Sequence, residues 1–368
     1  MSANALQQVR LRFSAEILEE ACRRFGFDPA TLAQQDGSAF VYEGRRGGRS
    51  AILKITPGLL DPPEAILGAT LEQLLGELDF VRYLDRNGVP VALPLPGCGG
   101  EWVESIPLDS QACFLVYAFE KAPGCLYPDE DELDFPEPVL MEWGRLLGWI
   151  HRLSVSYRPA NPAWSRPGWE ADDLLEPRGL IPADQPLVWQ RIQEIRTRLQ
   201  ALPRLPEEYG LVHGDFHHGN FLHDNGRLIA FDFDAAHHFW YAGDLAIALY
   251  NCLPMPRSKT TRRRAFSLHF LTHVLAGYGQ ERRLGAEWID RLPLFLKFNE
   301  VLDYAHHHKY WDLARLSDRR RAILADMRRR IENEIPVVEF KAADLQQLGS
   351  PGIPPGGAPA AGAKTEAE

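Results

Sequence analysis

The 368-residue sequence has few cysteines and no long apolar run. The five cysteines are Cys22, Cys98, Cys113, Cys125 and Cys252. They are odd in number and widely spaced, and no Cys-x-x-Cys pair occurs, which argues against a disulfide framework and against a cysteine-based zinc site. The longest apolar run, residues 112–119, is too short to cross a bilayer, and the N-terminus has no hydrophobic signal segment. We therefore expect a soluble protein of the cytoplasm.

The sequence also lacks a long basic block. Its formal net charge is −10, which argues against a nucleic-acid binder. The arginine clusters 262–264 and 319–321 are short and fall in expected helices, where they are typical of solvated faces. An acidic protein suits a cationic substrate, but net charge alone does not establish one. The length favours two modest lobes over one large core.

The densest group of polar residues lies between residues 211 and 234. From residue 211 the sequence reads Leu-Val-His-Gly-Asp-Phe-His-His-Gly-Asn-Phe-Leu-His-Asp-Asn-Gly-Arg-Leu-Ile-Ala-Phe-Asp-Phe-Asp. Asn-Gly between two apolar runs is a strong signal for a β-hairpin. Such a hairpin brings Asp215, Asn220, Asp232 and Asp234 to one end of a small ribbon. Carboxylate and amide oxygens gathered in this way suit Mg²⁺.

The order of these residues predicts a phosphoryl-transfer site. His-x-Asp, an Asn five positions later, and an apolar strand closing on Asp-Phe-x form the catalytic and metal half of the kinase signature. Asp215 is the expected catalytic residue, and Asn220, Asp232 and Asp234 are the expected Mg²⁺ ligands. Only nine residues separate Asp234 from Asp244, and no Ala-Pro-Glu follows. This spacing leaves no room for the long activation loop of a protein kinase.

With Gly214 where protein kinases have Arg, the sequence resembles the aminoglycoside phosphotransferase and choline kinase family from about Ser38 to about Pro336. The resemblance implies a two-lobed α+β fold of the protein-kinase type, with a small antiparallel β lobe plus helix and a mainly helical second lobe. It implies ATP or GTP as co-substrate, and as acceptor the hydroxyl of an aminoglycoside, an amino alcohol such as homoserine or choline, or a sugar. The expected parts are an N-terminal lobe at 1–119, a hinge at 120–124, a C-terminal lobe at 125–345 and a disordered tail at 346–368.

Residues 38–56 are expected to form a β-hairpin that carries Lys54 near the end of its second strand. A charge in an apolar strand needs a partner. Lys54 is either an ordinary edge-strand lysine or, in the kinase interpretation, the residue that bridges the α- and β-phosphates to a helix glutamate. The sequence lacks a full Gly-x-Gly-x-x-Gly. Gly37 and Ser38, just before the hairpin, are therefore the candidates for backbone contact with phosphates.

A helix is expected at 64–86, with Leu67, Leu71, Leu74, Leu78, Val81 and Leu84 on one stripe. At about 100° per residue, Glu77 falls on this apolar stripe, whereas Glu72 and Asp79 point away from it. An acid on an apolar face needs a reason, and we expect Glu77 to pair with Lys54. A buried strand at 113–119 then leads to the hinge, where backbone groups of Glu120 and Ala122 are expected to hydrogen-bond adenine.

In the C-terminal lobe, His151 is expected to be a core histidine in a helix at 139–153. Residues 155–186 are rich in Pro, Trp and Asp without clear periodicity, which is often a mark of function. Their candidates for the substrate mouth, with surface packing as the alternative, are Trp164, Trp169, Asp172 and Asp173. Glu300, Asp303 and Tyr304 are further candidates for the substrate pocket.

Two other features of this lobe concern local geometry. Asp244 is expected to be the N-cap of a helix over 245–249, and the resemblance gives it the role of bracing the catalytic turn. The tract 306–308 is three consecutive histidines, which point about 100° apart on a helix and cannot all share one ion.

Together these features predict an ATP-dependent phosphotransferase that acts on a small-molecule hydroxyl. Two alternatives stay open at this point. One is a protein Ser/Thr kinase of the bacterial stress-response type. The other is a nucleotide-binding pseudokinase scaffold, which the presence of Lys54, Asp215, Asn220 and Asp232 disfavours.

Overall fold

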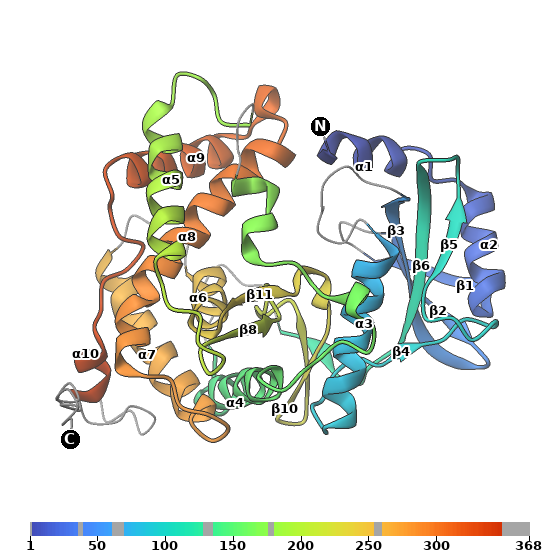
Figure 1. Ribbon diagram of the computed structural model, residues 1–368, viewed down its shortest axis with the longest axis horizontal. Helices are drawn as coiled ribbons and strands as arrows, with labels where there is room; N and C mark the ends of the chain where they lie inside the picture. Colours follow the sequence, from blue (N-terminus) through green and yellow to red (C-terminus); the bar gives the residue numbers. More distant parts are fainter. Residues whose placement is uncertain are drawn as a thin grey trace, which may run out of the picture.

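The computed structural model describes residues 2–35, 40–60, 70–127, 135–175, 180–253 and 260–347. It has two lobes (Figure 1): one is built on a six-stranded antiparallel sheet, and the other, larger lobe is mainly helical. This arrangement confirms the predicted two-lobed α+β fold. None of the described helices is both long and apolar enough to cross a membrane.

The N-terminal lobe is a sheet with helices on both faces. Its elements are α1 (Ser2–Arg10), α2 (Ala15–Phe25), β1 (Phe27–Gln35), β2 (Phe40–Arg46), β3 (Arg49–Leu59), α3 (Leu71–Arg86), β4 (Pro94–Leu95), β5 (Glu104–Pro107) and β6 (Ala112–Glu120). Strands β2 and β3 form the predicted hairpin, with Phe40 opposite Ile55. Strand β1, which the sequence analysis missed, pairs with β2 at the edge of the sheet.

Strand β6 is buried along its length because both faces of the sheet are covered. Phe114, Val116 and Ala118 belong to a core on the side of α1 and α2, whereas Leu115 and Tyr117 pack with α3 on the other side. This alternation follows from the two-residue period of a strand. Lys54 of β3 lies opposite Tyr117, so its side chain is on the α3 side of the sheet, towards the second lobe.

Helix α3 begins later than predicted. Thr70 caps it, with its side chain accepting a hydrogen bond from the Gln73 N–H. The predicted start at 64 falls in residues 61–69, outside the described residues.

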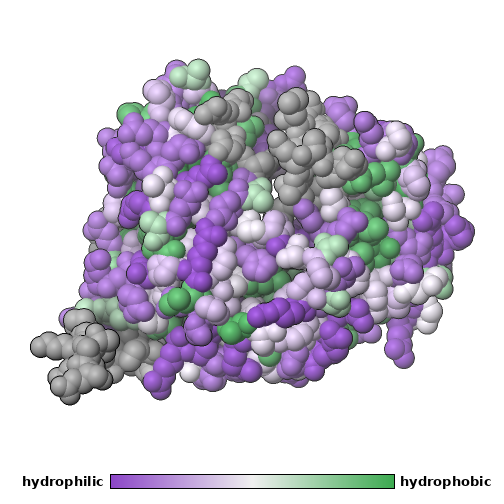
Figure 2. Space-filling model, in the orientation of Figure 1, coloured by the Kyte–Doolittle hydropathy of each residue, from purple (hydrophilic) through white to green (hydrophobic). Residues whose placement is uncertain are grey.

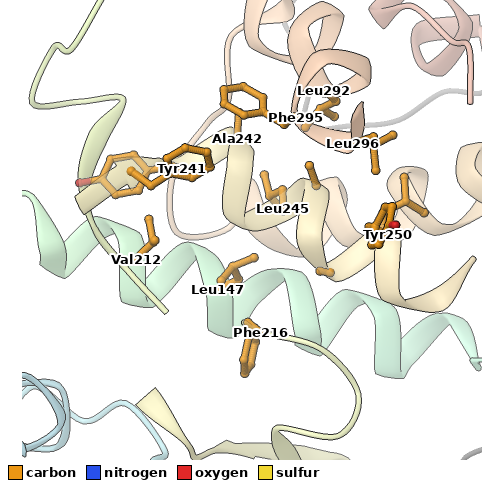
Figure 3. Close-up of a cluster of buried hydrophobic side chains, with 14 of the residues drawn as sticks. Leu147, Val212, Phe216, Tyr241, Ala242, Leu245, Tyr250, Leu292, Phe295 and Leu296 are labelled. Carbon is orange, nitrogen blue, oxygen red and sulfur yellow. The ribbon is translucent and has the colours of Figure 1, made fainter. Parts of the chain in front are cut away.

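The C-terminal lobe is mainly helical. Its elements are β7 (Cys125–Leu126), α4 (Glu137–Ser154), η1 (Pro162–Trp164), η2 (Trp169–Ala171), η3 (Asp173–Leu175), α5 (Pro186–Gln200), β8 (Tyr209–Val212), β9 (Phe221–Asp224), β10 (Arg227–Ala230), η4 (Phe233–Ala235), β11 (His237–Trp240), α6 (Tyr241–Cys252), α7 (Thr260–Tyr278), α8 (Ala286–Tyr310), η5 (Leu313–Arg315), α9 (Asp318–Glu332) and α10 (Ala342–Gln347). Helix α6 lies between α4 and α8, so that Leu147, Leu245 and Leu292 meet in one core (Figure 3). On the face drawn in Figure 2, hydrophilic side chains dominate and hydrophobic ones occur in separate groups.

Two local predictions in this lobe need correction. Helix α6 begins at Tyr241, so Asp244 lies in its first turn and is not the N-cap. The tail predicted at 346–368 overlaps the end of α10, and its remaining residues, 348–368, lie outside the described residues.

Candidate active site

The turn after β8 is held from below by a buried carboxylate. The Asp244 side chain accepts hydrogen bonds from the backbone N–H groups of His213 (3.1 Å) and Gly214 (3.0 Å). It also contacts Nε2 of His151 at 3.0 Å, which makes His151 the buried histidine that was predicted. Burial acts to raise the pKa of Asp244, but the hydrogen bonds from His151 and Gly214 lower it below its usual value. An anion is therefore fixed beneath the turn and orients it.

The turn requires glycine at position 214. Gly214 has φ +82°, and a Cβ there would lie 2.3 Å from the Ala235 carbonyl oxygen. The His213 ring closes the turn on its other side, with Nε2 3.0 Å from the Phe231 carbonyl oxygen. The turn and the segment that carries Asp232 are thus joined directly.

Asp215 and Asn220 meet within this turn. The Asn220 amide nitrogen donates to the Asp215 carbonyl oxygen (2.8 Å) and to its carboxylate (3.2 Å). These bonds leave the amide oxygen Oδ1 of Asn220 as its atom for a cation. His217 contacts the Asp215 carboxylate at 3.5 Å and accepts a hydrogen bond from Gly219 N–H (2.9 Å).

The hairpin β9–β10 brings the next acids to the same place. Asn225 and Gly226 have φ of 48° and 87°, as a tight hairpin turn requires, and Phe221 pairs with Ala230. Asp232 follows with φ 64° and ψ 63°. A non-glycine residue in this left-handed region is uncommon and costs energy, and such residues concentrate at functional sites.

Lys54 reaches Asp232 across the two lobes. Its Nζ lies 2.6 Å from Oδ1 of Asp232, although the two residues are 178 positions apart. Burial acts to lower the pKa of Lys54, but Tyr117 and the carboxylates of Asp232 and Asp234 raise it well above its usual value. The ion pair in turn lowers the pKa of Asp232 against the effect of burial. Both partners are therefore charged at neutral pH.

The expected ion pair between Lys54 and Glu77 is not formed in the structure. Glu77 is buried, with 1 % of its surface exposed, while Glu72 is exposed, as the helix phase predicted. Neither Glu77 carboxylate oxygen has a hydrogen-bond partner among the described residues. Burial raises the pKa of Glu77 to about 8, with Lys54 opposing the shift. Lys54 therefore pairs with Asp232, and Glu77 stays buried without a hydrogen-bond partner among the described residues.

Asp79 is buried although it lies off the predicted apolar stripe of α3. Asp79 is 4 % exposed and accepts hydrogen bonds from the Tyr157 hydroxyl (2.9 Å) and from Ala160 N–H (3.0 Å). Both donors come from the chain segment that follows α4, which packs over α3. The helix therefore has two buried faces, and the sequence stripe revealed one of them.

Asp234 lies in the short helix η4, two residues after Asp232. Solvent reaches its side chain, but the mass of surrounding protein, together with the charge of Asp232, raises its pKa to about 6. Asn220, Asp232 and Asp234 present only oxygen donors, the set that a hard divalent cation such as Mg²⁺ prefers. The chemistry of these residues therefore fits the expected ion.

Four other residues are expected to contact the nucleotide. Two of them, Gly37 and Ser38, lie outside the described residues. In the hinge, the Glu120 N–H donates to the Leu93 carbonyl oxygen at 2.8 Å, so its carbonyl oxygen is the group left for adenine at this residue. Ala122 lies just beyond β6, before the chain enters the second lobe at Cys125.

A cavity of about 470 Å³ opens beside Asp215. Trp169, Asp172 and Asp303 line it together with His306, whereas Trp164 does not. No lysine or arginine lines it among the residues that the structure describes. The described lining of this cavity thus combines carboxylates with aromatic rings.

Two other candidates for the substrate pocket form contacts inside the protein instead. Glu300 is buried and pairs with Lys297 and Arg330, and Tyr304 donates to Gln185. The side chain of Asp173 is outside the described part of the chain.

The three histidines of the tract 306–308 diverge onto different aromatic rings. His306 packs on Tyr310, His307 on Trp311 and His308 on Tyr304. Ligand atoms of His306, His307 and Asp303 nevertheless come within 4.8 Å of one another.

Sequence reasoning missed Arg166, a buried side chain near the site with three hydrogen bonds. It is 3 % exposed and donates to three backbone carbonyl oxygens: those of Gln73 in α3, Asp234 and Ala236. Its only sequence signal was its place in the Pro- and Trp-rich segment without periodicity.

The family model described as the phosphotransferase enzyme family matches residues 33–288. A relative named amicoumacin kinase, from Bacillus subtilis (strain 168), is 36% identical over 331 residues, which cover 90% of this chain and 95% of the relative.

Solved structures are similar over most of the chain. Amicoumacin kinase hAmiN in complex with AMP-PNP, Ca²⁺ and Ami is 33% identical, with a TM-score of 0.84, covering 92% of this chain and 99% of that one. A microcompartment-associated aminopropanol kinase, 18% identical, matches with a TM-score of 0.66 over 87% of this chain and 98% of that one, a likeness of fold.

Proposed function

The chain belongs to the phosphotransferase enzyme family and transfers the γ-phosphate of ATP to a hydroxyl group of a small molecule; on this premise, we propose that its acceptor is a cationic molecule of the amicoumacin type. The observation that carries the proposal is the charge of the cavity beside Asp215, with Asp172 and Asp303 on its wall and no basic side chain among its described lining residues. Carboxylates in a concave, partly desolvated site favour a positive ligand over a neutral one. Two relatives that are more than 30% identical bear the name amicoumacin kinase.

The residues around Asp215 support defined roles in this reaction. Asp215 faces the cavity and accepts the proton of the acceptor hydroxyl. Asn220, Asp232 and Asp234 hold Mg²⁺, whose positive charge offsets that of the phosphates when it is bound. Lys54 steadies the α- and β-phosphates, with Glu77 behind it.

Adenine contacts complete the proposed nucleotide site. The carbonyl oxygen of Glu120 and the backbone of Ala122 bind adenine, and Gly37 and Ser38 contact the phosphates. In this scheme backbone groups read the base, so the identity of the side chains at the hinge carries little specificity.

The chemical step follows from these positions. The acceptor oxygen forms a bond to the γ-phosphorus as the bond from phosphorus to the oxygen that bridges the β-phosphate breaks. Asp215 takes the hydroxyl proton, and ADP leaves. There is no covalent intermediate with the protein, so catalysis rests on positioning and on charge stabilisation.

The test is turnover of ATP with a panel of acceptors: amicoumacin, an aminoglycoside, homoserine, choline and a neutral sugar. We expect ADP release and a phosphorylated product with amicoumacin, and faster turnover with cationic acceptors than with the sugar. Protein substrates, which the protein-kinase alternative requires, are expected to stay unmodified. A preference for the neutral sugar would contradict the proposal.

A variant of the cavity tests the role of its charge. Asp303→Asn is expected to raise KM for the cationic acceptor about 10-fold with kcat unchanged, because it removes binding that substrate and transition state share. The control is Asp318→Asn, since the side chain of Asp318 is 98% exposed on α9, away from the cavity. An unchanged KM in Asp303→Asn would show that this carboxylate does not bind the acceptor.

A further inference from the structure

The segment 161–175, here called the strap, joins the two lobes at the cleft. Its backbone lies against α3, because a Cβ on Gly76 would be 2.1 Å from the carbonyl oxygen of Trp164. Its other side pairs with β11. The His238 N–H donates to the Pro167 carbonyl oxygen at 2.8 Å, and Nδ1 of His238 lies 3.1 Å from the Arg166 carbonyl oxygen. The strap thus touches both the helix that carries Glu77 and the strand that follows the proposed metal ligands.

Arg166 is the side chain through which the strap holds these parts together. Its Nη1 donates to Gln73 O at 2.9 Å, its Nε donates to Ala236 O at 2.6 Å, and its Nη2 donates to Asp234 O. The three acceptors come from α3 and from the segment 232–236, which are more than 150 residues apart in the sequence. One rigid, planar group therefore fixes the distance between the N-terminal helix and the loop of Asp232 and Asp234.

Among the positively charged side chains, only arginine suits this pattern of hydrogen bonds. A guanidinium has five N–H donors in a fixed plane, whereas a lysine ammonium is a single point on a flexible stem and cannot reach three separated carbonyl oxygens in the same geometry. The carbonyl groups that Arg166 holds belong to Asp234 itself and to Ala236, two residues further on. Loss of these bonds would free the backbone of a proposed cation ligand without changing the ligand.

We propose that Arg166 is a positioning residue that holds the segment 232–236 in the geometry that binds the divalent cation with the nucleotide. The inference rests on the proposed metal role of Asp232 and deepens it. Residues outside the ligand set that orient ligands typically change metal affinity by about 10–100-fold when replaced. The same order of effect is expected here.

The experiment measures AMP-PNP affinity by calorimetry, with and without Mg²⁺, in wild type, Arg166→Lys and Arg166→Gln. We expect the gain in affinity that Mg²⁺ gives the wild type to fall at least about 10-fold in both variants. Affinity without Mg²⁺ should stay within a few-fold of wild type, a result that general loss of structure would not produce. Circular dichroism and thermal melting establish whether each variant is folded. If Arg166→Gln does not fold, the Mg²⁺ effect measured in Arg166→Lys decides the test.

Two further variants separate the possible failures. Arg158→Ala is the control, because Arg158 is exposed and its hydrogen bonds go to Val155 and Tyr157 next to it. Asp232→Asn tests the premise. If Asp232→Asn loses the Mg²⁺ effect and Arg166→Lys keeps it, the inference about Arg166 is overturned while the metal site stands. If Asp232→Asn keeps the effect, the metal assignment fails and the inference with it.

Discussion

The buried acid of α3 gives the sharpest prediction about stability. Glu77 has a pKa of about 8 in the folded protein against an ordinary value of 4.5, mainly because burial disfavours its charged form. Between these two pH values the folded chain holds a proton on Glu77 that the unfolded chain has released. The free energy of unfolding therefore falls as pH rises through this window and stops falling above about pH 8.

Glu77→Gln removes this dependence, because an amide does not titrate. One pKa unit corresponds to about 1.4 kcal/mol, so the difference between about 8 and 4.5 amounts to about 5 kcal/mol. We expect the stability of the variant relative to wild type to grow by up to that amount from pH 4.5 to pH 8. Other titrating groups are common to both proteins and cancel in the comparison.

The assay is urea unfolding of nucleotide-free protein at several pH values from 4.5 to 8.5. Glu72→Gln is the matched control, since Glu72 is exposed on the same helix, and its stability should track that of wild type at every pH. A constant difference between Glu77→Gln and wild type across this range would refute the reasoning. It would mean that Glu77 is ionised in the fold and has the charged partner that the sequence suggested.

Three other substitutions test the site and its frame. Asp215→Asn should lower turnover by about 10²–10⁴-fold while Mg²⁺·ATP affinity, measured by calorimetry, stays near that of wild type, because the variant loses the base and keeps the shape; equal losses of both would indicate a structural role. Asp232→Asn, in which asparagine tolerates the left-handed backbone, should reduce AMP-PNP affinity in Mg²⁺ to the metal-free level, and an unchanged affinity would contradict the metal assignment. Gly76→Ala should destabilise the fold by about 1–3 kcal/mol in urea unfolding, because the new Cβ would meet the backbone of Trp164, and this outweighs the helix preference of alanine. Gly99→Ala is the control and should leave the stability unchanged, since no atom lies within 4 Å of the Cβ it would add.

Local chemistry made much of the fold predictable. The Asn225-Gly226 turn, the hairpin around Lys54 and the burial of Glu77 each depend on a few neighbouring residues and on the period of a helix or strand. The order of Asp215, Asn220 and Asp232 in the chain likewise implied their meeting, because a short hairpin leaves them little choice.

Pairings between distant segments could not be predicted in the same way. Lys54 pairs with Asp232, 178 positions away in the sequence, and not with Glu77. No periodicity within one helix or strand reveals which side chains meet once two lobes have come together. Strand β1 was missed because it is mostly exposed and carries Pro29, which leaves no alternating pattern. Arg166 was missed because its partners are backbone carbonyl oxygens, which every sequence contains.

The balance of charge at the cleft explains why nucleotide and cation should bind together. Asp215, Asp232 and Asp234 are close enough in the candidate site for their charges to interact, and Lys54 pairs with Asp232. Arg166 gives its hydrogen bonds to carbonyl oxygens, so it positions the loop without pairing with a carboxylate among the described residues. The remaining negative charge would repel a triphosphate. Burial raises the pKa of Asp234, and the neighbouring charge of Asp232 raises it further. Without a divalent cation, binding ATP would set phosphate against carboxylate, and Lys54 alone could not serve both.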